Sequence, residues 1–223
     1  MKERYSRNIP AISEIDMNKL MNSHVLVVGC GGLGGYIIEY LARLGIGSIT
    51  AVDGDVFSES NLNRQILSTC KNIGLSKADA AKERVKAISP DVEIIAVPEF
   101  FTENNADKLL KDIDIVIDAL DNIESRFLLE DAAERVGVPI VHGAIDGWNI
   151  QAMLIKPGSR LLHQMYTDKN TSSKTALSFT PAICAGIQVS TAVSYLCDGE
   201  SPLDGGLFIA SLKDLESNII NLK

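Results

Sequence analysis

The chain has 223 residues and a formal net charge of −8, and 46% of its residues are apolar while only 5% are aromatic. This length suits one large domain, or one domain with a small extension, and it is enough to bury a sizeable core. Because the net charge is negative and no basic tract is present, the sequence lacks the electrostatic footprint of a nucleic-acid-binding protein, and only a local basic site stays open.

The amino terminus and the cysteines indicate the cellular compartment. The first ten residues are charged and lack the apolar region of a signal peptide, and no apolar run reaches the length that spans a membrane. Cys30, Cys70, Cys184 and Cys197 form no C-x-x-C pair, so neither a zinc site nor a redox pair is indicated. We therefore expect a reduced, cytoplasmic and soluble protein that does not enter a membrane.

A short amphipathic helix is predicted at 12–21, and the stretch that organises the chain begins after it. Val25–Val28 is an unbroken apolar run, typical of a strand buried on both faces. Apolar residues then recur at helical spacing over 36–44, and Gly45 is placed to end that helix in a left-handed conformation. Residues 48–52 read as a second strand. This order of strand, helix and strand is that of a βαβ unit.

The turn between the first strand and its helix carries the G-x-G-x-x-G spacing of a dinucleotide-binding unit. Gly29 allows the tight turn, Gly31 lets backbone amides approach a phosphate, and Gly34 lets the helix pack close to the sheet. The amino terminus of the helix offers unpaired N–H groups to an anion. Asp53, which closes the second strand, can accept hydrogen bonds from two ribose hydroxyls. The pattern therefore predicts a bound nucleotide, without indicating which one.

Strands and helices continue to alternate after Asp53. The predicted elements are a loop with one helical turn at 53–65, a helix at 77–88 capped by Ser76, a strand at 92–97, a helix at 102–110 capped by Thr102, a strand at 113–117, a helix after 122 that runs to 136, and a strand at 139–141. Such alternation indicates a doubly wound parallel sheet.

The pattern changes after Gly143. Residues 150–155 alternate as an antiparallel strand does, and 157–180 form a long segment with a polar centre, which suggests a mobile functional loop. An apolar helix at 182–196 and a terminal hairpin at 207–212 and 218–222 follow. We expect an α/β, Rossmann-like, doubly wound and mainly parallel sheet, extended by antiparallel strands at the C-terminal end. Residues 1–223 would form a single domain, with a nucleotide-binding core at about 24–145 and the crossover loop, helix and hairpin at about 146–223.

Two basic residues after Asp53 favour a nucleoside triphosphate over a nicotinamide cofactor. Arg64 can bind phosphate oxygens with its fork, and Lys77, at the start of a helix, can add a point charge. The structural alternatives are a surface Arg64 that pairs with Glu59 and an exposed helical Lys77. Either alternative is the better explanation of one residue alone, but the two cations together with the glycine loop favour phosphate binding.

Asp121 follows the apolar run 113–117, so it should lie at the carboxyl end of a central strand, where open α/β sheets bind ligands. A carboxylate beside phosphates is a natural magnesium ligand. The alternative is an N-cap for the next helix, a role for which Asn122 competes. Asp118 is a weaker candidate, because it can simply end the strand.

Other polar residues are less informative. Arg126 lies one turn into the next helix, where it can reach a phosphate or the substrate, or instead pair with Glu130 at i+4. The three histidines form no visible site. His142 ends a strand beside the crevice and His163 begins the polar crossover, but a core or surface role is the default for each.

These residues carry a resemblance to a known family. The chain resembles the ThiF/MoeB/HesA family, relatives of the ubiquitin-activating enzymes. The matching segments are R-Y-S-R-N at 4–8, V-L-V-V-G-C-G-G-L-G at 25–34, L-G-I-G-S-I-T-A-V-D-G-D-V-F-S-E-S-N-L-N-R-Q at 44–65, G-L-S-K-A at 74–78 and D-A-L-D-N at 118–122. They cover roughly the first 145 residues, and the terminal helix and hairpin fit more loosely.

The resemblance implies ATP- and Mg²⁺-dependent adenylation of a small ubiquitin-like sulfur-carrier protein at its C-terminal Gly-Gly, in a pathway such as thiamine or molybdopterin synthesis. By motif position, Asp53 would hold the ribose, and Asn61, Arg64 and Lys77 would hold or neutralise the phosphates. The candidate nucleotide-binding residues are Gly29, Gly31, Gly32, Gly34, Asp53, Asp55, Asn61, Arg64, Gln65, Lys77 and Asn122. The candidate catalytic residues are Arg7, Arg64, Lys77 and Asp121, with Asp121 as the magnesium ligand and Arg7 reaching the phosphates from the other subunit of a homodimer.

The sequence departs from the family pattern at its cysteines. Many members carry paired C-x-x-C zinc ligands near the C-terminus and a reactive cysteine in the crossover, and neither feature is present at 157–180 or after it. Cys184 lies just past the crossover in an apolar helix, where a buried core cysteine is the better interpretation. Adenylation is therefore supported, whereas structural zinc and a covalent thioester or acyl-disulfide step are not.

Three alternatives stay open. Relatives of this fold activate a carboxylate on a modified tRNA base, as a tRNA threonylcarbamoyladenosine dehydratase does, although the acidic charge argues against this. A non-catalytic partner of the same fold, binding a carrier or a second subunit, is supported by the missing cysteines. An NAD-dependent oxidoreductase rests on the glycine loop alone and leaves Arg64 and Lys77 unexplained.

Overall fold

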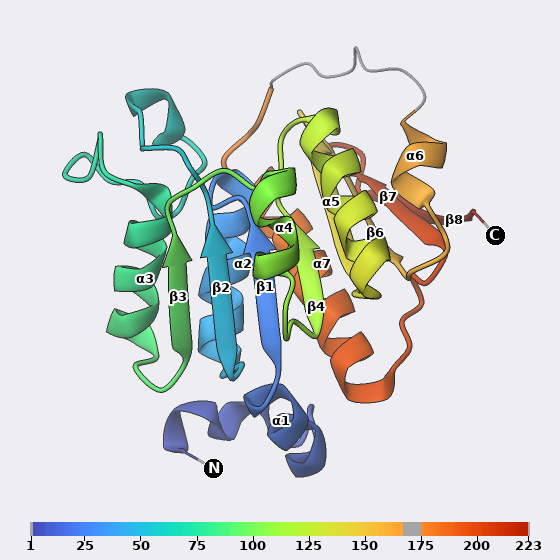
Figure 1. Ribbon diagram of the computed structural model, residues 1–223, viewed down its shortest axis with the longest axis horizontal. Helices are drawn as coiled ribbons and strands as arrows, with labels where there is room; N and C mark the ends of the chain where they lie inside the picture. The colour runs from blue at the N-terminus through green and yellow to red at the C-terminus, as the bar shows by residue number, and fades with distance from the viewer. Residues whose placement is uncertain (1, 167–174, 223) are drawn as a thin grey trace.

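One mixed sheet runs through the whole described chain in the computed structural model, which describes residues 2–166 and 175–222 (Figure 1). Its strands are β1 (His24–Val28), β2 (Ser48–Val52), β3 (Glu93–Val97), β4 (Ile115–Asp118), β5 (Ile140–Asp146), β6 (Asn149–Ile155), β7 (Gly206–Ser211) and β8 (Glu216–Asn221). They lie in the order β3-β2-β1-β4-β5-β6-β7-β8. The pairs from β3 to β5 are parallel and those from β5 to β8 are antiparallel, which confirms the predicted fold class.

Helices cover both faces of the sheet. They are the 3-10 helices η1 (Glu3–Asn8) and η2 (Glu59–Asn61) and the α-helices α1 (Glu14–Met21), α2 (Gly32–Leu44), α3 (Lys77–Ile88), α4 (Glu103–Leu109), α5 (Ile123–Val136), α6 (Leu161–Met165) and α7 (Thr180–Asp198). Helices α3, α2 and α7 pack side by side on one face, and α4, α5 and α6 on the other (Figure 1). Each layer encloses its own cluster of buried apolar side chains, as expected for a doubly wound sheet.

The turn from β1 into α2 requires glycine at two positions. Gly29 has φ +99°, and a Cβ there would lie 2.6 Å from the backbone oxygen of Ala119. A Cβ at Gly34 would lie 1.8 Å from the backbone oxygen of Gly29. The helix therefore packs against the loop as closely as the spacing predicts, and Gly45 ends α2 with φ +91°.

Several helix starts match the predicted caps. The side chain of Ser76 accepts a hydrogen bond from the backbone N–H of Asp79, and Asn122 accepts one from Ser125. Thr102 forms a capping box at α4. Such side chains satisfy donors that the first helical turn leaves unpaired.

The crossover segment differs from its prediction. Residues 157–180 read as a loop, but α6 forms at Leu161–Met165 within them. The rest of the predicted loop lies partly at 167–174, outside the described residues. The helix predicted at 182–196 extends over Thr180–Asp198.

Among the described residues, α7 is the one helix long and apolar enough to cross a membrane, with 19 residues and a mean hydropathy of 1.2. The helix reaches this length because the polar side chains that interrupt the apolar run in the sequence do not end the helix. In the fold α7 packs on α2, β5 and β6. Its buried Gln188 donates to the backbone oxygens of Asp118 and Val141 at 2.8 and 3.3 Å, so it serves as a core helix.

Candidate functional site

The acidic residue after β2 is fixed against the glycine loop. One carboxylate oxygen of Asp53 accepts the backbone N–H of Cys30 at 2.7 Å, and the other accepts that of Asp55 at 2.8 Å. Burial raises the pKa of Asp53 above its ordinary value, although both hydrogen bonds and Lys77 act in the opposite direction. The βαβ unit thus brings together the acid and the loop that the sequence predicts as a nucleotide cradle.

The N-L-N-R-Q segment lies directly on this loop. The amide nitrogen of Gln65 is 3.4 Å from the point a Cβ of Gly31 would occupy, and the stem of Arg64 is 3.9 Å from that of Gly32. Asn61 is buried, and its side chain accepts the backbone N–H of Ser58 at 3.0 Å. Asn61 therefore shapes the loop that presents Arg64 and Gln65.

The two cations have different surroundings. The Lys77 side chain is only 9% exposed, and its Nζ lies 2.9 Å from a carboxylate oxygen of Asp55, so the alternative of an exposed helical lysine is wrong. Arg64 donates from Nη1 to the backbone oxygen of Ser60 and to Oδ1 of Asn63, both at 2.9 Å. Neither acceptor is a carboxylate, and the alternative pairing with Glu59 does not occur among the described contacts. Phosphate oxygens would be stronger acceptors for this guanidinium.

The loop after β4 borders the glycine loop. The backbone N–H of Ala119 donates to the oxygen of Val28 at 2.9 Å. Asp121, two residues later, is exposed. Because the Oδ1 of Asn122 caps α5 at 2.8 Å from the N–H of Ser125, Asp121 is free of the capping role. The Nδ2 of Asn122 lies 3.5 Å from a carboxylate oxygen of Asp121.

Arg7 lies at the other end of the molecule from this crevice. It is an exposed residue of η1. The neighbouring Asn8 donates to the backbone oxygen of Leu44, the last residue of α2, at 3.0 Å. Since α2 has 13 residues and a helix rises 1.5 Å per residue, about 20 Å of helix separates η1 from the glycine loop of the same chain.

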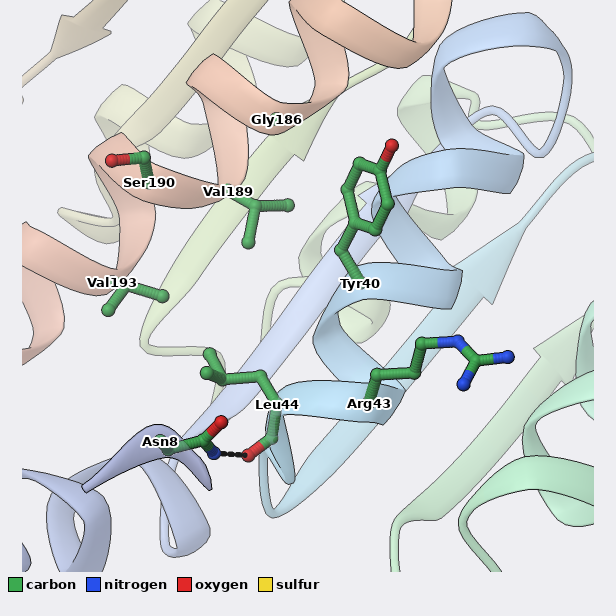
Figure 2. A pocket seen from close by; sticks show the side chains of 8 residues that line it. All are labelled: Asn8, Tyr40, Arg43, Leu44, Gly186, Val189, Ser190 and Val193. Atoms are coloured by element: carbon green, nitrogen blue, oxygen red, sulfur yellow. Dashed lines mark hydrogen bonds between the residues drawn. The ribbon is translucent and has the colours of Figure 1, made fainter. Parts of the chain in front are cut away.

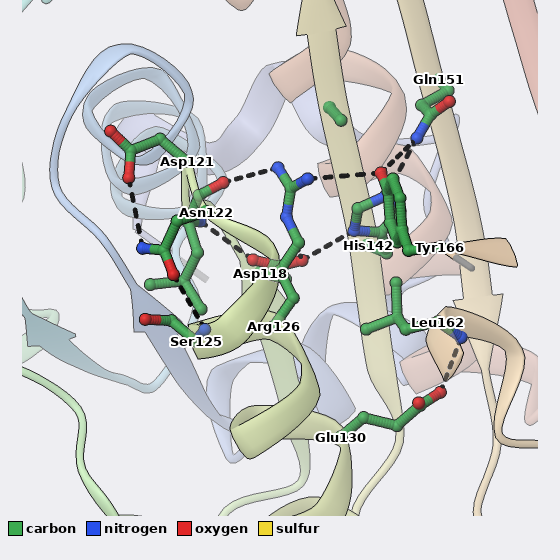
Figure 3. Close-up of polar contacts among 12 residues, drawn as sticks. Asp118, Asp121, Asn122, Ser125, Arg126, Glu130, His142, Gln151, Leu162 and Tyr166 are labelled. Carbon is green, nitrogen blue, oxygen red and sulfur yellow. Dashed lines mark hydrogen bonds and ion pairs between the residues drawn. The ribbon is translucent and has the colours of Figure 1, made fainter. Parts of the chain in front are cut away.

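A buried polar network next to Asp121 was missed by the sequence analysis (Figure 3). Asp118, taken there as a strand end, accepts from the Nδ1 of His142 at 2.7 Å and lies 3.5 Å from the Nε of Arg126. The hydroxyl of Tyr166 lies 3.2 Å from the Nε2 of His142 and 2.6 Å from the Nε2 of Gln151. Asp118 and His142 are neighbours in the register of β4 and β5. The sequence shows only that each residue ends a predicted strand, and it does not give the register that pairs them.

The alternative ion pair between Arg126 and Glu130 does not form. Arg126 is buried and donates to the backbone oxygen of Leu120 at 2.6 Å. Glu130 instead accepts the backbone N–H of Leu162 at 2.9 Å and pairs with His163, which also stacks on Phe127. His163 therefore ties α6 to α5.

Burial favours the neutral form of the histidine in this network. Burial lowers the pKa of His142 below its ordinary value of 6.5, although Asp118 acts to raise it. A neutral ring that donates from Nδ1 to Asp118 leaves Nε2 as an acceptor. The hydroxyl of Tyr166 can donate to that nitrogen, and burial raises the pKa of Tyr166, which keeps its proton in place.

We expect the free energy of unfolding to fall as the pH drops below about 6.5. The unfolded chain then protonates His142, whereas the lowered pKa keeps the folded form neutral, so protons favour unfolding until the folded pKa is also passed. Urea titrations at about pH 7.5 and about pH 5.5 would measure this change. His142→Gln, which cannot titrate, should lose less stability over that interval. Equal losses in both proteins would contradict the assignment.

The cysteines near the site are poor nucleophiles. Cys184 is fully buried, its Sγ donates to the backbone oxygen of Gln151 at 3.4 Å, and burial raises its pKa to about 12. Burial also raises the pKa of Cys30 in the glycine loop. Both thiols therefore stay protonated, which agrees with their interpretation as packing residues.

Two of the hollows on the described surface are not lined by the phosphate-binding candidates. One, of about 440 Å³, lies between α2 and α7, where Leu44, Val189 and Val193 line it beside Asn8 (Figure 2). The other, of about 490 Å³, is lined by Gly147, Trp148 and residues 175–177.

Comparison with known proteins decides the family. A profile of the ThiF family matches residues 5–223. The chain belongs to the ThiF family. With its named relatives it is an adenylyltransferase of the ThiF, MoeB and HesA type, as the sequence motifs predict.

Two relatives and one solved structure illustrate the similarity. The ThiF-family chain is 33% identical to the SAMP-activating enzyme E1 of Haloferax volcanii over 222 residues, covering 96% of itself and 82% of that protein. It is 39% identical to the sulfur carrier protein adenylyltransferase of Thermus thermophilus over 145 residues, covering 64% of itself and 54% of that protein. The E. coli tRNA N6-threonylcarbamoyladenosine dehydratase, TcdA, superposes with a TM-score of 0.74 at 26% identity, covering 86% of this chain and 93% of that one.

Proposed function

We propose that this ThiF-family protein uses ATP to adenylate the C-terminal Gly-Gly carboxylate of a small ubiquitin-like sulfur-carrier protein, in sulfur-cofactor biosynthesis in the cytoplasm. The observation that carries the proposal is the convergence of Arg64 and Gln65 on the glycine loop, beside the buried cation Lys77. A nicotinamide cofactor leaves these cations without a role. The Oε1 of Gln65 is buried and has no hydrogen-bond partner among the described residues.

In the proposed reaction, a carboxylate oxygen of the carrier attacks the α-phosphorus of ATP. The bond from that phosphorus to the oxygen bridging it to the β-phosphorus breaks, and pyrophosphate leaves with the electron pair. Asp53 would hold the ribose, while Arg64 and Lys77 would offset negative charge on the phosphates. Lys77 would exchange its present partner Asp55, whose side chain is 55% exposed, for phosphate oxygens. Positioning and charge stabilisation suffice, so no protein nucleophile is required.

The residues present fit a magnesium ion held jointly with the substrate. Mg²⁺ is usually bound through one or two carboxylates together with substrate phosphates. Asp121 offers one exposed carboxylate beside the glycine loop, and the part of the chain that the structure describes contains no cluster of three or more His, Cys, Asp or Glu side chains suited to a metal. When bound, the ion would neutralise phosphate charge.

A homodimer would place the Arg7 of one subunit at the site of the other. Within one chain the whole length of α2 separates η1 from the glycine loop, so Arg7 can serve only a neighbouring subunit. The groove between α2 and α7 presents the apolar side chains of Leu44, Val189 and Val193 next to η1 (Figure 2). We propose this face as the contact with a second copy. A twofold axis perpendicular to α2 would set η1 of each chain toward the glycine loop of the other.

ATP–pyrophosphate exchange tests the proposed function. We expect the purified protein to exchange labelled pyrophosphate into ATP only when a carrier ending in Gly-Gly is present. A carrier lacking its two terminal glycines is the matched control. In parallel, Mg-ATP should raise the melting temperature of the protein in a thermal-shift assay, and NAD should not. A folded dimer that binds ATP but shows no exchange with any cellular carrier would contradict the proposal and favour a non-catalytic partner.

A second candidate function is activation of a modified tRNA base. It is favoured by the superposition on E. coli TcdA, of which this chain covers 93%. The net charge of −8 argues against it. Retention of the protein on tRNA at moderate salt, together with ATP consumption that depends on tRNA, would replace the carrier proposal with this one.

A further inference from the structure

The hydroxyl of Tyr166 joins elements that are far apart in the chain (Figure 3). Tyr166 directly follows α6. Its oxygen accepts a hydrogen bond from the Nε2 of Gln151, in β6, at 2.6 Å and another from the Nη1 of Arg126, in α5, at 3.2 Å. Because His142 is neutral, the hydroxyl proton of Tyr166 can be donated to the Nε2 of His142, in β5, at 3.2 Å. One donor and two acceptor positions of the hydroxyl are thus all used.

Arg126 carries this connection to the loop after β4. Its Nη2 donates to the backbone oxygen of Leu120 at 2.6 Å, and the backbone N–H of Leu120 donates to Asp118 at 2.9 Å. Leu120 is therefore held on both its backbone groups by buried charged side chains. Asp121 follows it immediately, and the side chain of Asp121 contacts Asn122 at 3.5 Å. The backbone of Leu120 consequently sets the position of Asp121.

Burial strengthens each hydrogen bond in this network. Asp118 and His142 are fully buried, and Arg126 is 8% exposed. Hydrogen bonds among such groups gain from the low local dielectric, and an unpaired member is costly. The Nε of Arg126 already lacks a hydrogen-bond partner. If the Tyr166 hydroxyl were removed, Nη1 would also lose its acceptor, and Leu120, Asp118 and the face of the ring, whose centroid is 5.6 Å from Cζ, would remain as contacts of the guanidinium.

We propose that Tyr166 is a positioning residue, which acts through Arg126 to fix the loop that presents Asp121 to magnesium and the phosphates. The role of Asp121 rests on the proposed function. The physical link from Tyr166 to the loop does not, because it is built from contacts within this chain.

Tyr166→Phe removes the hydroxyl and keeps the ring. We expect the turnover number for ATP–pyrophosphate exchange to fall roughly tenfold, as for a small misplacement of a catalytic group, with the KM for ATP nearly unchanged. The Mg²⁺ concentration for half-maximal activity should rise. Tyr195→Phe is the matched control, because Tyr195 lies near the far end of α7 and contacts Lys156 through its ring. It should behave as wild type.

Hydrogen exchange of the ligand-free protein gives a readout independent of activity. We expect amides at 119–123 to exchange faster in Tyr166→Phe than in wild type or Tyr195→Phe. Unchanged exchange at 119–123 would overturn the proposal even if activity fell. Faster exchange in a protein whose wild type lacks adenylation activity would support the link while rejecting the proposed function. If Tyr166→Phe fails to fold, Gln151→Leu, which removes the 2.6 Å donor to the same oxygen, tests the same loop.

Discussion

Replacing Asp121 by alanine is expected to lower the rate of ATP–pyrophosphate exchange by roughly 10²- to 10³-fold, the usual effect of losing one electrostatic contact to a reacting centre. Binding of ATP itself should change little, because Asp121 is exposed and would meet the phosphates only through magnesium. Exchange assays at saturating ATP, combined with calorimetric titration of ATP, separate the two effects. Full exchange activity in this variant would remove the magnesium assignment.

Asp53→Ala is the matched comparison and should show the opposite pattern. Its carboxylate is assigned to the ribose, and losing charge-assisted hydrogen bonds of about 1.5–3 kcal/mol would weaken ATP binding roughly 10- to 100-fold. Because Asp53 also holds the backbone of Cys30 and Asp55, its melting temperature must be checked first. A folded Asp53→Ala that binds ATP normally would contradict the ribose assignment.

Arg7→Ala is expected to reduce exchange by roughly 10³-fold, the lower end of the effect of an arginine supplied in trans to a phosphoryl group. The expected cause is lost charge stabilisation at the partner's phosphates, since Arg7 cannot reach the glycine loop of its own chain. Lys2→Ala is the control, because Lys2 also lies at the amino terminus but pairs with Asp91. Light scattering should show that both variants remain dimers.

Mixed dimers test the direction of this contact. When Arg7→Ala and Asp121→Ala chains are co-expressed, half of the dimers should be mixed, and each mixed dimer has one site with both residues intact. Activity should therefore recover to about a quarter of wild type. If the mixture stays as inactive as the separate variants, Arg7 does not act across a dimer in the proposed way.

The βαβ unit and its glycine turn could be predicted because their signals are local. The apolar run Val25–Val28, the glycine spacing and the acid at Asp53 lie within one short stretch, and each is required by the geometry of the turn. Gly34 illustrates this requirement, because any side chain there would overlap the oxygen of Gly29. Asn61, Arg64 and Gln65 were found through a motif, whereas their contact with the loop depends on how the chain returns to it.

The network around Tyr166 could not be predicted in the same way. Asp118, His142 and Tyr166 are separated by 24 residues at each step along the chain, and they meet only through strand register and helix packing. The element that ends at Tyr166 was itself missed, because α6 has five residues and begins after Arg160 in a left-handed conformation, without a capping side chain. No periodic pattern marks so short a helix.

Helix α2 connects two places that, in the proposed dimer, belong to different active sites. Its first turn would face the nucleotide of its own chain, while Asn8, which follows Arg7, donates a hydrogen bond to the backbone oxygen of Leu44 at its last turn. In that dimer the length of α2 would set the distance between the two active sites. A nucleotide that shifts the first turn would move the arginine offered to the neighbour, so the two halves would sense each other's occupancy mechanically.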